Sequence, residues 1–347
     1  MGRSLRLTQE TARGMHRAWR QILVHGPAAT REARRQPEAT CELTALLAEP
    51  PSRVRRLVPE FPALYAHLAG VGPVETLTTN PVAMHRIRGA AGALRFQAQS
   101  QTGACSGALD LRMFFNAWAH GCAVVEPVSE CSLRFFDEHG RFLHAVYPTP
   151  ETNMDAWYEL VVRYAADEQR PFLDVARRPF GGVTDPDFSA AAEPAAVLDW
   201  SRRRLHADGG RLGTMLYRPG QQVRPLAPDA LERLLQSLAD AELPVSVLAG
   251  NAGVAQRFTG LVRWLRLNDN AYRVHDAGFA LTVTPSAIRA VEMVHRPART
   301  GFDRSLDCRD AAGETVLSVA EPEGASRAEK AAWQRLLNAL EGEAGGS

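Results

Sequence analysis

Two periodicities divide the chain into helical and extended stretches. Apolar residues recur at the three- and four-residue spacing of an amphipathic helix in six places, and several of these stretches end at proline or glycine. The stretches predicted to be helical are 7–25, 38–49, 53–69, 151–166, 228–241 and 326–341.

From Gly72 the pattern changes to alternating apolar and polar residues, which is typical of half-buried strands. Leu109, Leu111 and Met113 alternate with polar residues in this way. The clearest hairpin joins SLRFFD to RFLHAVYP, because Gly140 in the intervening turn tolerates a positive φ. The segment 113–121 fits either a strand edge or a short turn of helix.

The first half of the pattern returns in the second half of the chain. ELPVSVLAGNAGVAQRFTG follows the order of GPVETLTTNPVAMHRIRG, and SLDCRDAAGETVLSVA follows that of SLRFFDEHGRFLHAVY. The matched pairs at an offset of 171 are Pro73/Pro244, Leu77/Leu248, Asn80/Asn251 and Gly89/Gly260, and those at an offset of 173 are Ser132/Ser305 and Gly140/Gly313. Two matches in the same order at nearly one offset indicate a duplicated α+β unit.

The duplication divides the chain into three parts. We predict a first repeat at 1–166, a linker rich in Pro, Gly, Asp and Ala at 167–193, and a second repeat at 194–347. The expected fold class is α+β, with two antiparallel sheets, flanking helices and a cleft between the halves.

Composition and charge narrow the function classes. The 347 residues include 45% apolar and 23% charged side chains, as in an ordinary soluble globular protein. Basic and acidic residues number 40 and 39, so the net charge of +1 supplies no field for nucleic acid or an anionic membrane. No apolar run approaches the ~20 residues of a membrane span, and the N-terminus lacks the apolar core of a signal peptide. Five cysteines without C-x-x-C spacing fit free thiols in a cytoplasmic protein.

Several common chemistries have no motif in this sequence. It contains no H-E-x-x-H zinc motif, no P-loop and no G-x-S-x-G nucleophile elbow. The string GNAGVAQ lacks the third glycine and the following helix of a dinucleotide fingerprint, so we interpret it as a turn between strands.

The strand motifs resemble those of the bacterial cytoplasmic hemin-transport and hemin-degrading proteins. The similarity is carried by GPVETLTTN, LDLRMFFNAWAHGCAV and SLRFFDEHGRFLHAVY, then by LPVSVLAGNAGVAQRFTG and VHDAGFALTVTPSAIRAVEMVHRP, and covers about residues 40 to 320. The resemblance implies a duplicated α+β protein in which each half is an antiparallel sheet with helices. It also implies one haem, bound between the halves, which is either passed to an accepting protein or degraded by opening of the porphyrin ring.

The resemblance assigns roles to three residues. Arg112 matches the arginine of the family's D-L-R-hydrophobic-F motif, which implies a place over the distal face of haem and a catalytic role in any degradation. His85 matches the histidine of a V-H-E motif, and Arg296 matches the basic residue of an R-K-P motif near the haem propionates. From the residues alone, Arg112 could instead be a structural arginine paired with Asp110 or Glu126. His85 could equally be an ordinary strand histidine.

The family's proximal iron ligand has no direct match. It is the histidine of a D-x-H-x-F motif that precedes a G-x-R-x-x-A-L segment, and GGRLGTML at 209–216 matches that later segment. Counting back without a gap places Leu198 at the ligand position and Trp200 at the aromatic position. His206 is the nearest histidine and the candidate metal ligand, with a surface histidine as the alternative. Phe258 stands where the second repeat is expected to carry a histidine.

These residues support two functional hypotheses. The first is a cytoplasmic haem-binding protein for haem trafficking or storage, with haem degradation as a further activity, and with haem and a haem-accepting protein as partners. The second is a divergent member of the family that no longer ligates haem and acts as a binding or scaffold protein. Leu198 and Phe258 favour the second hypothesis, whereas Arg112 and Arg296 favour the first.

Overall fold

The computed structural model describes residues 42–125, 130–167, 216–268, 270–298 and 302–344. Within these residues two nine-stranded sheets form, and every strand pairs antiparallel to its neighbours. The first sheet contains, in spatial order, β1 (Val54–Leu57), β7 (His120–Val124), β8 (Ser132–Phe136), β9 (Phe142–Pro148), β2 (Pro73–Thr79), β3 (Ala83–Ala90), β15 (Phe279–Val283), β14 (Ala271–Asp276) and β13 (Trp264–Asn268). The second contains β10 (Gln222–Pro225), β16 (Ala290–Pro297), β17 (Phe302–Arg309), β18 (Thr315–Ala320), β11 (Val245–Gly250), β12 (Val254–Gly260), β6 (Asp110–Phe114), β5 (Thr102–Cys105) and β4 (Arg95–Gln97).

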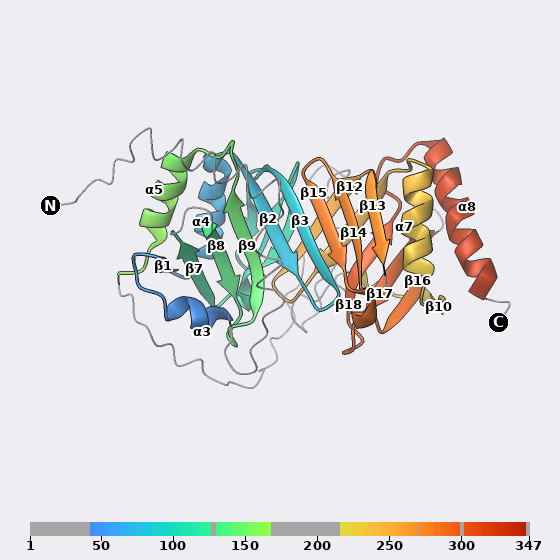
Figure 1. Cartoon of the computed structure of the whole chain (residues 1–347), viewed down its shortest axis with the longest axis horizontal. Helices are drawn as coiled ribbons and strands as arrows, with labels where there is room; N and C mark the ends of the chain where they lie inside the picture. The colour runs from blue at the N-terminus through green and yellow to red at the C-terminus, as the bar shows by residue number, and fades with distance from the viewer. Residues whose placement is uncertain (1–41, 126–129, 168–215, 269, 299–301, 345–347) are drawn as a thin grey trace.

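The two repeats exchange three strands. β13, β14 and β15 of the second repeat extend the first sheet beyond β3 (Figure 1). β4, β5 and β6 of the first repeat extend the second sheet beyond β12. The α+β class, the duplication and the two antiparallel sheets are therefore confirmed. The expectation of one sheet per half is wrong, because each sheet takes strands from both halves.

The repeats nevertheless have the same strand order. The hairpin β2–β3 corresponds to β11–β12, and the hairpin β8–β9 to β17–β18, as the sequence offsets predict. Gly140 and Gly313 occupy equivalent turns, with φ of 73° and 79°. Only glycine adopts this conformation without a steric penalty, which explains why both repeats carry it there.

A pair of equivalent asparagines ties the repeats together. Asn80 follows β2 and Asn251 follows β11, and each side chain reaches into the other repeat. The Nδ2 group of Asn80 donates to the carbonyls of Gly250 (3.0 Å) and Val316 (2.8 Å), and that of Asn251 to the carbonyls of Thr79 (2.9 Å) and Leu143 (2.7 Å). Each Oδ1 also accepts two backbone N–H bonds in its own turn. Both amides are thus fully used, and each one crosslinks the two repeats.

Helices close the two ends of the molecule. α4 (Phe61–Leu68) and α5 (Met154–Tyr164) lie at one end, and α7 (Ala230–Asp240) and α8 (Arg327–Ala344) at the other (Figure 1). α3 (Glu42–Leu47) packs its leucines against β1, β7 and β8. The predicted helices at 38–49, 151–166, 228–241 and 326–341 are confirmed where the structure describes them, and the one at 7–25 lies outside the described residues.

The predicted helix at 53–69 is wrong in its first half. Val54 to Leu57 form strand β1, and α4 begins only at Phe61. Pro59 explains the break, because proline has no N–H to donate and disfavours helical geometry in the residue before it. Segment 113–121 combines both expected forms, with the end of β6 followed by a 3-10 turn at Phe115–Ala117.

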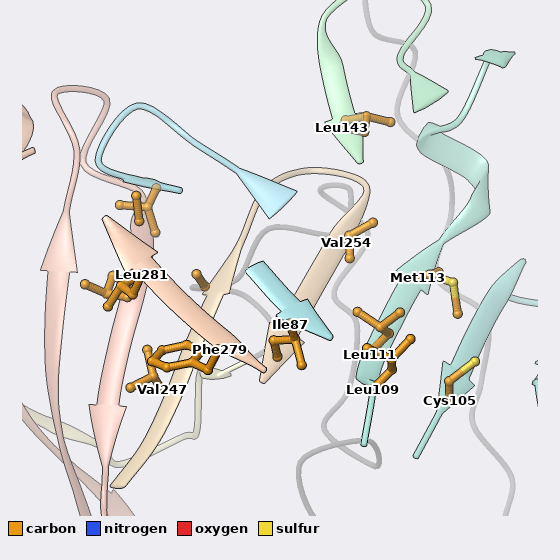
Figure 2. Packing of buried hydrophobic residues seen from close by; sticks show 14 of the residues in the cluster. Ile87, Cys105, Leu109, Leu111, Met113, Leu143, Val247, Val254, Phe279 and Leu281 are labelled. Carbon is orange, nitrogen blue, oxygen red and sulfur yellow. The ribbon is translucent and has the colours of Figure 1, made fainter. Parts of the chain in front are cut away.

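One large apolar core fills the space between the sheets and the end helices. Figure 2 shows that it draws on both repeats: Ile87 and Leu111 belong to the first, and Val254 and Phe279 to the second. Successive residues of a strand point to opposite faces. The neighbours of these core residues in each strand therefore point away from the core. The face of the second sheet that points away from the core carries the candidate site.

Replacing Asn80 by alanine should lower the free energy of unfolding by about 2–4 kcal/mol, because it leaves carbonyls of the other repeat without donors. Urea unfolding followed by circular dichroism measures this change. Asn270→Ala, in the exposed turn between β13 and β14, is the matched control and should change stability by less than about 0.5 kcal/mol. Equal shifts for the two variants would contradict the interdomain role of Asn80.

Candidate functional site

The strand register places Arg112 on the face of the second sheet opposite the core. Arg112 pairs with Ala255 of β12 and Ala104 of β5. Residues paired across strands share one face, so Arg112, Ala255 and Leu248 point to the same side. We call the surface formed by Arg112, Phe114, Leu248 and Ala255 the Arg112 face.

The Arg112 face places a charge in apolar surroundings. Phe114, Leu248 and Ala255 are buried and form a cluster with Leu216, which lies at the C-terminal end of the segment matching GGRLGTML. Arg112 itself is 5% exposed. Burial lowers the pKa of its guanidinium to about 10, so the group remains charged at neutral pH. A buried cation beside apolar walls is suited to an apolar ligand that carries negative charge.

The neighbouring charges on this face already have partners. Arg257 donates through Nε to Asp110 at 2.6 Å, and its guanidinium lies 3.5 Å from Glu323. Of the two carboxylates considered as partners of Arg112, Asp110 bonds to Arg257, and Glu126 lies outside the described residues.

Arg296 lies on the same face of the second sheet and is bonded within the protein. Its Nε donates to the Leu216 carbonyl at 2.9 Å, and its two terminal nitrogens donate to Ser305 and Asp307. Ser305 and Ser318 each donate to the other oxygen of Asp307 at 2.7 Å. All three guanidinium nitrogens thus have protein acceptors, and one of them holds Leu216 against the Arg112 face. The role of Arg296 toward a propionate stays a prediction, and it would require some of these bonds to be exchanged.

His85 belongs to β3 of the first sheet, and its side chain lies between the two sheets. Its ring is fully buried and packs edge-on against Phe279, with ring centroids 5.3 Å apart. Gln256 donates to the His85 carbonyl at 3.2 Å, while Ala255, the preceding residue, faces Arg112. β12 therefore separates His85 from Arg112, and the structure does not bring these two predicted residues together.

His85 belongs to a polar cluster between the sheets. Thr78 donates to Gln256 at 2.9 Å and contacts Nδ1 of His144 at 3.0 Å. Neither ring nitrogen of His85, nor Nε2 of His144, has a hydrogen-bond partner among the described residues. Burial lowers the pKa of each histidine to about 3, so both rings are neutral near pH 7.

The remaining residues considered as ligands divide into two groups. His206, Leu198 and Trp200 lie outside the described residues. Phe258 is described, and its ring stacks on Phe279 at 3.6 Å in the core. The phenylalanine found where a histidine was expected is thus a core residue, and it points away from the Arg112 face.

The sequence interpretation missed Phe114 and Leu216 as parts of the site. Phe114 lies two residues after Arg112 in the strand DLRMF and therefore points to the same face, so the alternation of side chains along the strand could have identified it. No local signal identifies Leu216, because its contact with Leu248 and Ala255 is formed only in the folded chain.

Two broader properties of the described residues also bear on function. No three histidine, cysteine, aspartate or glutamate side chains among them are grouped as a metal site would require. None of the helices that the structure describes is long and apolar enough to cross a membrane.

Arg296→Met should lower the free energy of unfolding by about 3–5 kcal/mol, because it leaves the Asp307 carboxylate buried without its cation. Arg309→Met is the matched control: it breaks the more exposed ion pair with Glu292 and should cost about 1 kcal/mol or less. Urea unfolding compares the two variants, and equal losses would contradict a structural role for the buried pair.

Acid should destabilise the protein through His85 and His144. Below pH 6.5 the unfolded chain binds protons at these rings, whereas the folded chain binds them only near pH 3. Each ring should therefore lower the free energy of unfolding by about 1.4 kcal/mol per pH unit as the pH falls through that window. His85→Gln should reduce this slope in unfolding curves recorded from pH 7 to pH 5. His139→Gln, in the turn after β8, is the control, and an unchanged slope in His85→Gln would contradict the assignment.

Comparison with known proteins assigns this chain to a family. Residues 40–164 and 210–340 match the model of the haemin-degrading HemS.ChuX domain. The chain is 27% identical to the hemin transport protein HmuS of Yersinia pestis over 82% of this chain and 86% of that protein. It is also 27% identical to the hemin transport protein HemS of Yersinia enterocolitica over 81% of this chain and 84% of that protein.

Solved structures share the fold. Apo-PhuS, a heme-binding protein from Pseudomonas aeruginosa, superimposes with a TM-score of 0.70 at 24% identity, covering 95% of this chain and 99% of PhuS. The heme degrading enzyme ChuS of Escherichia coli O157:H7 gives a TM-score of 0.69 at 22% identity, covering 94% and 99%. Because the family model matches both repeats, the chain belongs to the haemin-degrading HemS.ChuX domain family.

Proposed function

We propose that this protein binds haem at the Arg112 face and serves haem trafficking or storage in the cytoplasm. The observation that carries the proposal is the buried, charged Arg112 beside an apolar cluster of Phe114, Leu216 and Leu248. Haem is a flat apolar ring with two anionic propionates, so it needs apolar walls, nearby cations and an axial donor to its iron.

The residues present fit the first two requirements. Phe114, Leu248 and Ala255 supply apolar side chains on the sheet, and Leu216 packs with them. Arg112 supplies a cation that can donate hydrogen bonds to a group on the distal side of the ring. Arg296 lies on the same face and is the proposed partner for a propionate.

The axial donor is assigned to His206. The two fully buried histidines of the described chain, His85 and His144, lie between the sheets and do not point to the Arg112 face. His206 precedes Leu216 by ten positions, and Leu216 is fixed against this face by Arg296. This connection supports His206 as the ligand in preference to His85.

The relatives support two activities for the same site. The two Yersinia proteins are hemin transport proteins, whereas ChuS of Escherichia coli is a heme degrading enzyme. Degradation requires an electron donor, dioxygen and an open coordination position on the iron. We propose trafficking or storage as the main function, delivery to a haem-accepting protein as its outcome, and degradation, with Arg112 as the catalytic residue, as a further activity.

A divergent member without iron ligation is the second candidate function. Leu198 at the expected ligand position favours it. The core position of Phe258 weakens it, because that residue does not face the site.

Titration with hemin tests the proposal. The wild-type protein should show a saturable Soret shift at one equivalent, and His206→Ala should abolish that shift by removing the axial donor. Arg112→Met should lower the affinity for hemin about tenfold or more, because it removes a residue that surrounds the bound metal without ligating it. His139→Ala, in the turn after β8, is the control and should titrate like the wild type.

The titration also separates the alternatives. Weak binding that does not saturate would favour the scaffold function. A saturable shift that persists in His206→Ala would assign the ligand to another residue, with His85 tested next. Bleaching of the Soret band after addition of ascorbate, reduced in Arg112→Met, would support degradation.

A further inference from the structure

The hairpin β13–β14 at the edge of the first sheet carries an unusual surface. Trp264 is 74% exposed, more than any other large hydrophobic residue in the described ranges. It pairs with His275, so the two side chains share one face. Single exposed apolar residues are common on protein surfaces, but Trp264 lies beside two arginines on the same face.

The next pair along the hairpin places two positive charges together. Arg266 and Arg273 are direct partners in the β13–β14 register and point to the same face as Trp264. Like charges directly opposite each other in a sheet are destabilising. Neither arginine forms an ion pair or side-chain hydrogen bond with the described residues.

Other arginines nearby are neutralised. Arg263 pairs with Asp276 at 3.2 Å, Arg86 with Glu75 at 2.5 Å, and Arg88 with Glu151. The Arg266–Arg273 pair is thus exceptional on this face. Its charge also acts on His275, because burial first and then Arg273 lower the pKa of that ring. The concentration of unneutralised charge points to an anionic partner.

β13 is also an edge strand. It pairs with β14 on one side, and none of the described strands pairs with its other side. An edge of this kind can accept a further strand through its free N–H and C=O groups. The inner side of β13 is covered, because Leu265 and Leu267 pack on the core near α7. Only the outer face and the strand edge are open to a partner.

We propose that the β13–β14 hairpin docks an acidic segment of a partner protein, which adds to the first sheet as a strand beside β13. Trp264 covers an apolar side chain of that segment, and Arg266 and Arg273 bind its carboxylates. Trp and Arg are the residues most enriched at the energetic centres of protein interfaces. The net charge of +1 supplies no extended basic field for a nucleic acid. The proposal is independent of haem binding.

A synthetic peptide tests the docking surface. The probe is a fluorescein-labelled eight-residue peptide in which threonine alternates with the residues of the face that meets the hairpin, one of which is valine and three of which are glutamate. Its counterpart carries lysine in place of glutamate, and fluorescence anisotropy measures binding to the full chain. The acidic peptide should bind saturably and more weakly at high salt. Trp264→Ser should weaken binding about tenfold, the loss expected for an interface anchor.

Charge exchange provides the decisive control. The variant Arg266→Glu/Arg273→Glu should lose the acidic peptide and gain the lysine peptide, which a merely misfolded variant would not do. Arg335→Glu, on the exposed side of α8, is the matched control and should bind the acidic peptide like the wild type.

Four results would overturn the proposal. The first is the absence of saturable binding of the acidic peptide, and the second is equal binding of that peptide by wild type and Trp264→Ser. The third is tighter binding of oligo-deoxythymidylate than of the acidic peptide. The fourth is self-association in sedimentation that Trp264→Ser abolishes. The third result would assign the surface to nucleic acid and the fourth to a second copy of this chain.

Discussion

Backbone pairing between β3 and β15, and between β6 and β12, is the interaction on which the rest of the structure depends. It joins residues of the two repeats into single sheets, so neither repeat completes a sheet alone. The crosslinks of Asn80 and Asn251 reinforce this pairing between segments 170 and 172 residues apart. One strand exchange therefore explains the continuous core and the position of Arg112 within the sheet of the other repeat.

The two buried arginines of the second sheet illustrate different ways to keep a cation inside a protein. Arg296 is neutralised by Asp307 and two serines, and so it holds together β16, β17, β18 and the main chain at Leu216. Arg112 lies beside the apolar cluster of Phe114, Leu216, Leu248 and Ala255, and burial lowers the pKa of its guanidinium to about 10, so it is charged at neutral pH. We therefore propose Arg112 for contact with an anionic ligand, and Arg296 as the residue that positions Leu216.

Much of the fold could be predicted from the sequence because the repeats preserve the residues with strict geometric roles. Both repeats carry asparagine in the crosslink, at Asn80 and Asn251, and glycine in the turn, at Gly140 and Gly313. Crosslinks and turns of this kind tolerate little change. The strand exchange could not be predicted, because alternation shows which face a residue occupies and not which strand lies beside it. The motif singles out Arg112 as a candidate site residue, but the separation of His85 from it depends on the relative placement of two sheets, which the sequence does not show. The partner of Arg296 likewise depends on the register of β16 with β17.

The strand exchange also has a consequence for biosynthesis. When residues up to Tyr164 have left the ribosome, the first sheet still lacks β13, β14 and β15, and the strands β4 to β6 have no sheet to join. Edges of this kind attract other strands, and contacts between residues distant in sequence form slowly. Pairing between the repeats must therefore wait until β12 and β15, which end at Gly260 and Val283, have been translated. The nascent first repeat is consequently the stage at which this protein is most exposed to aggregation and to chaperones.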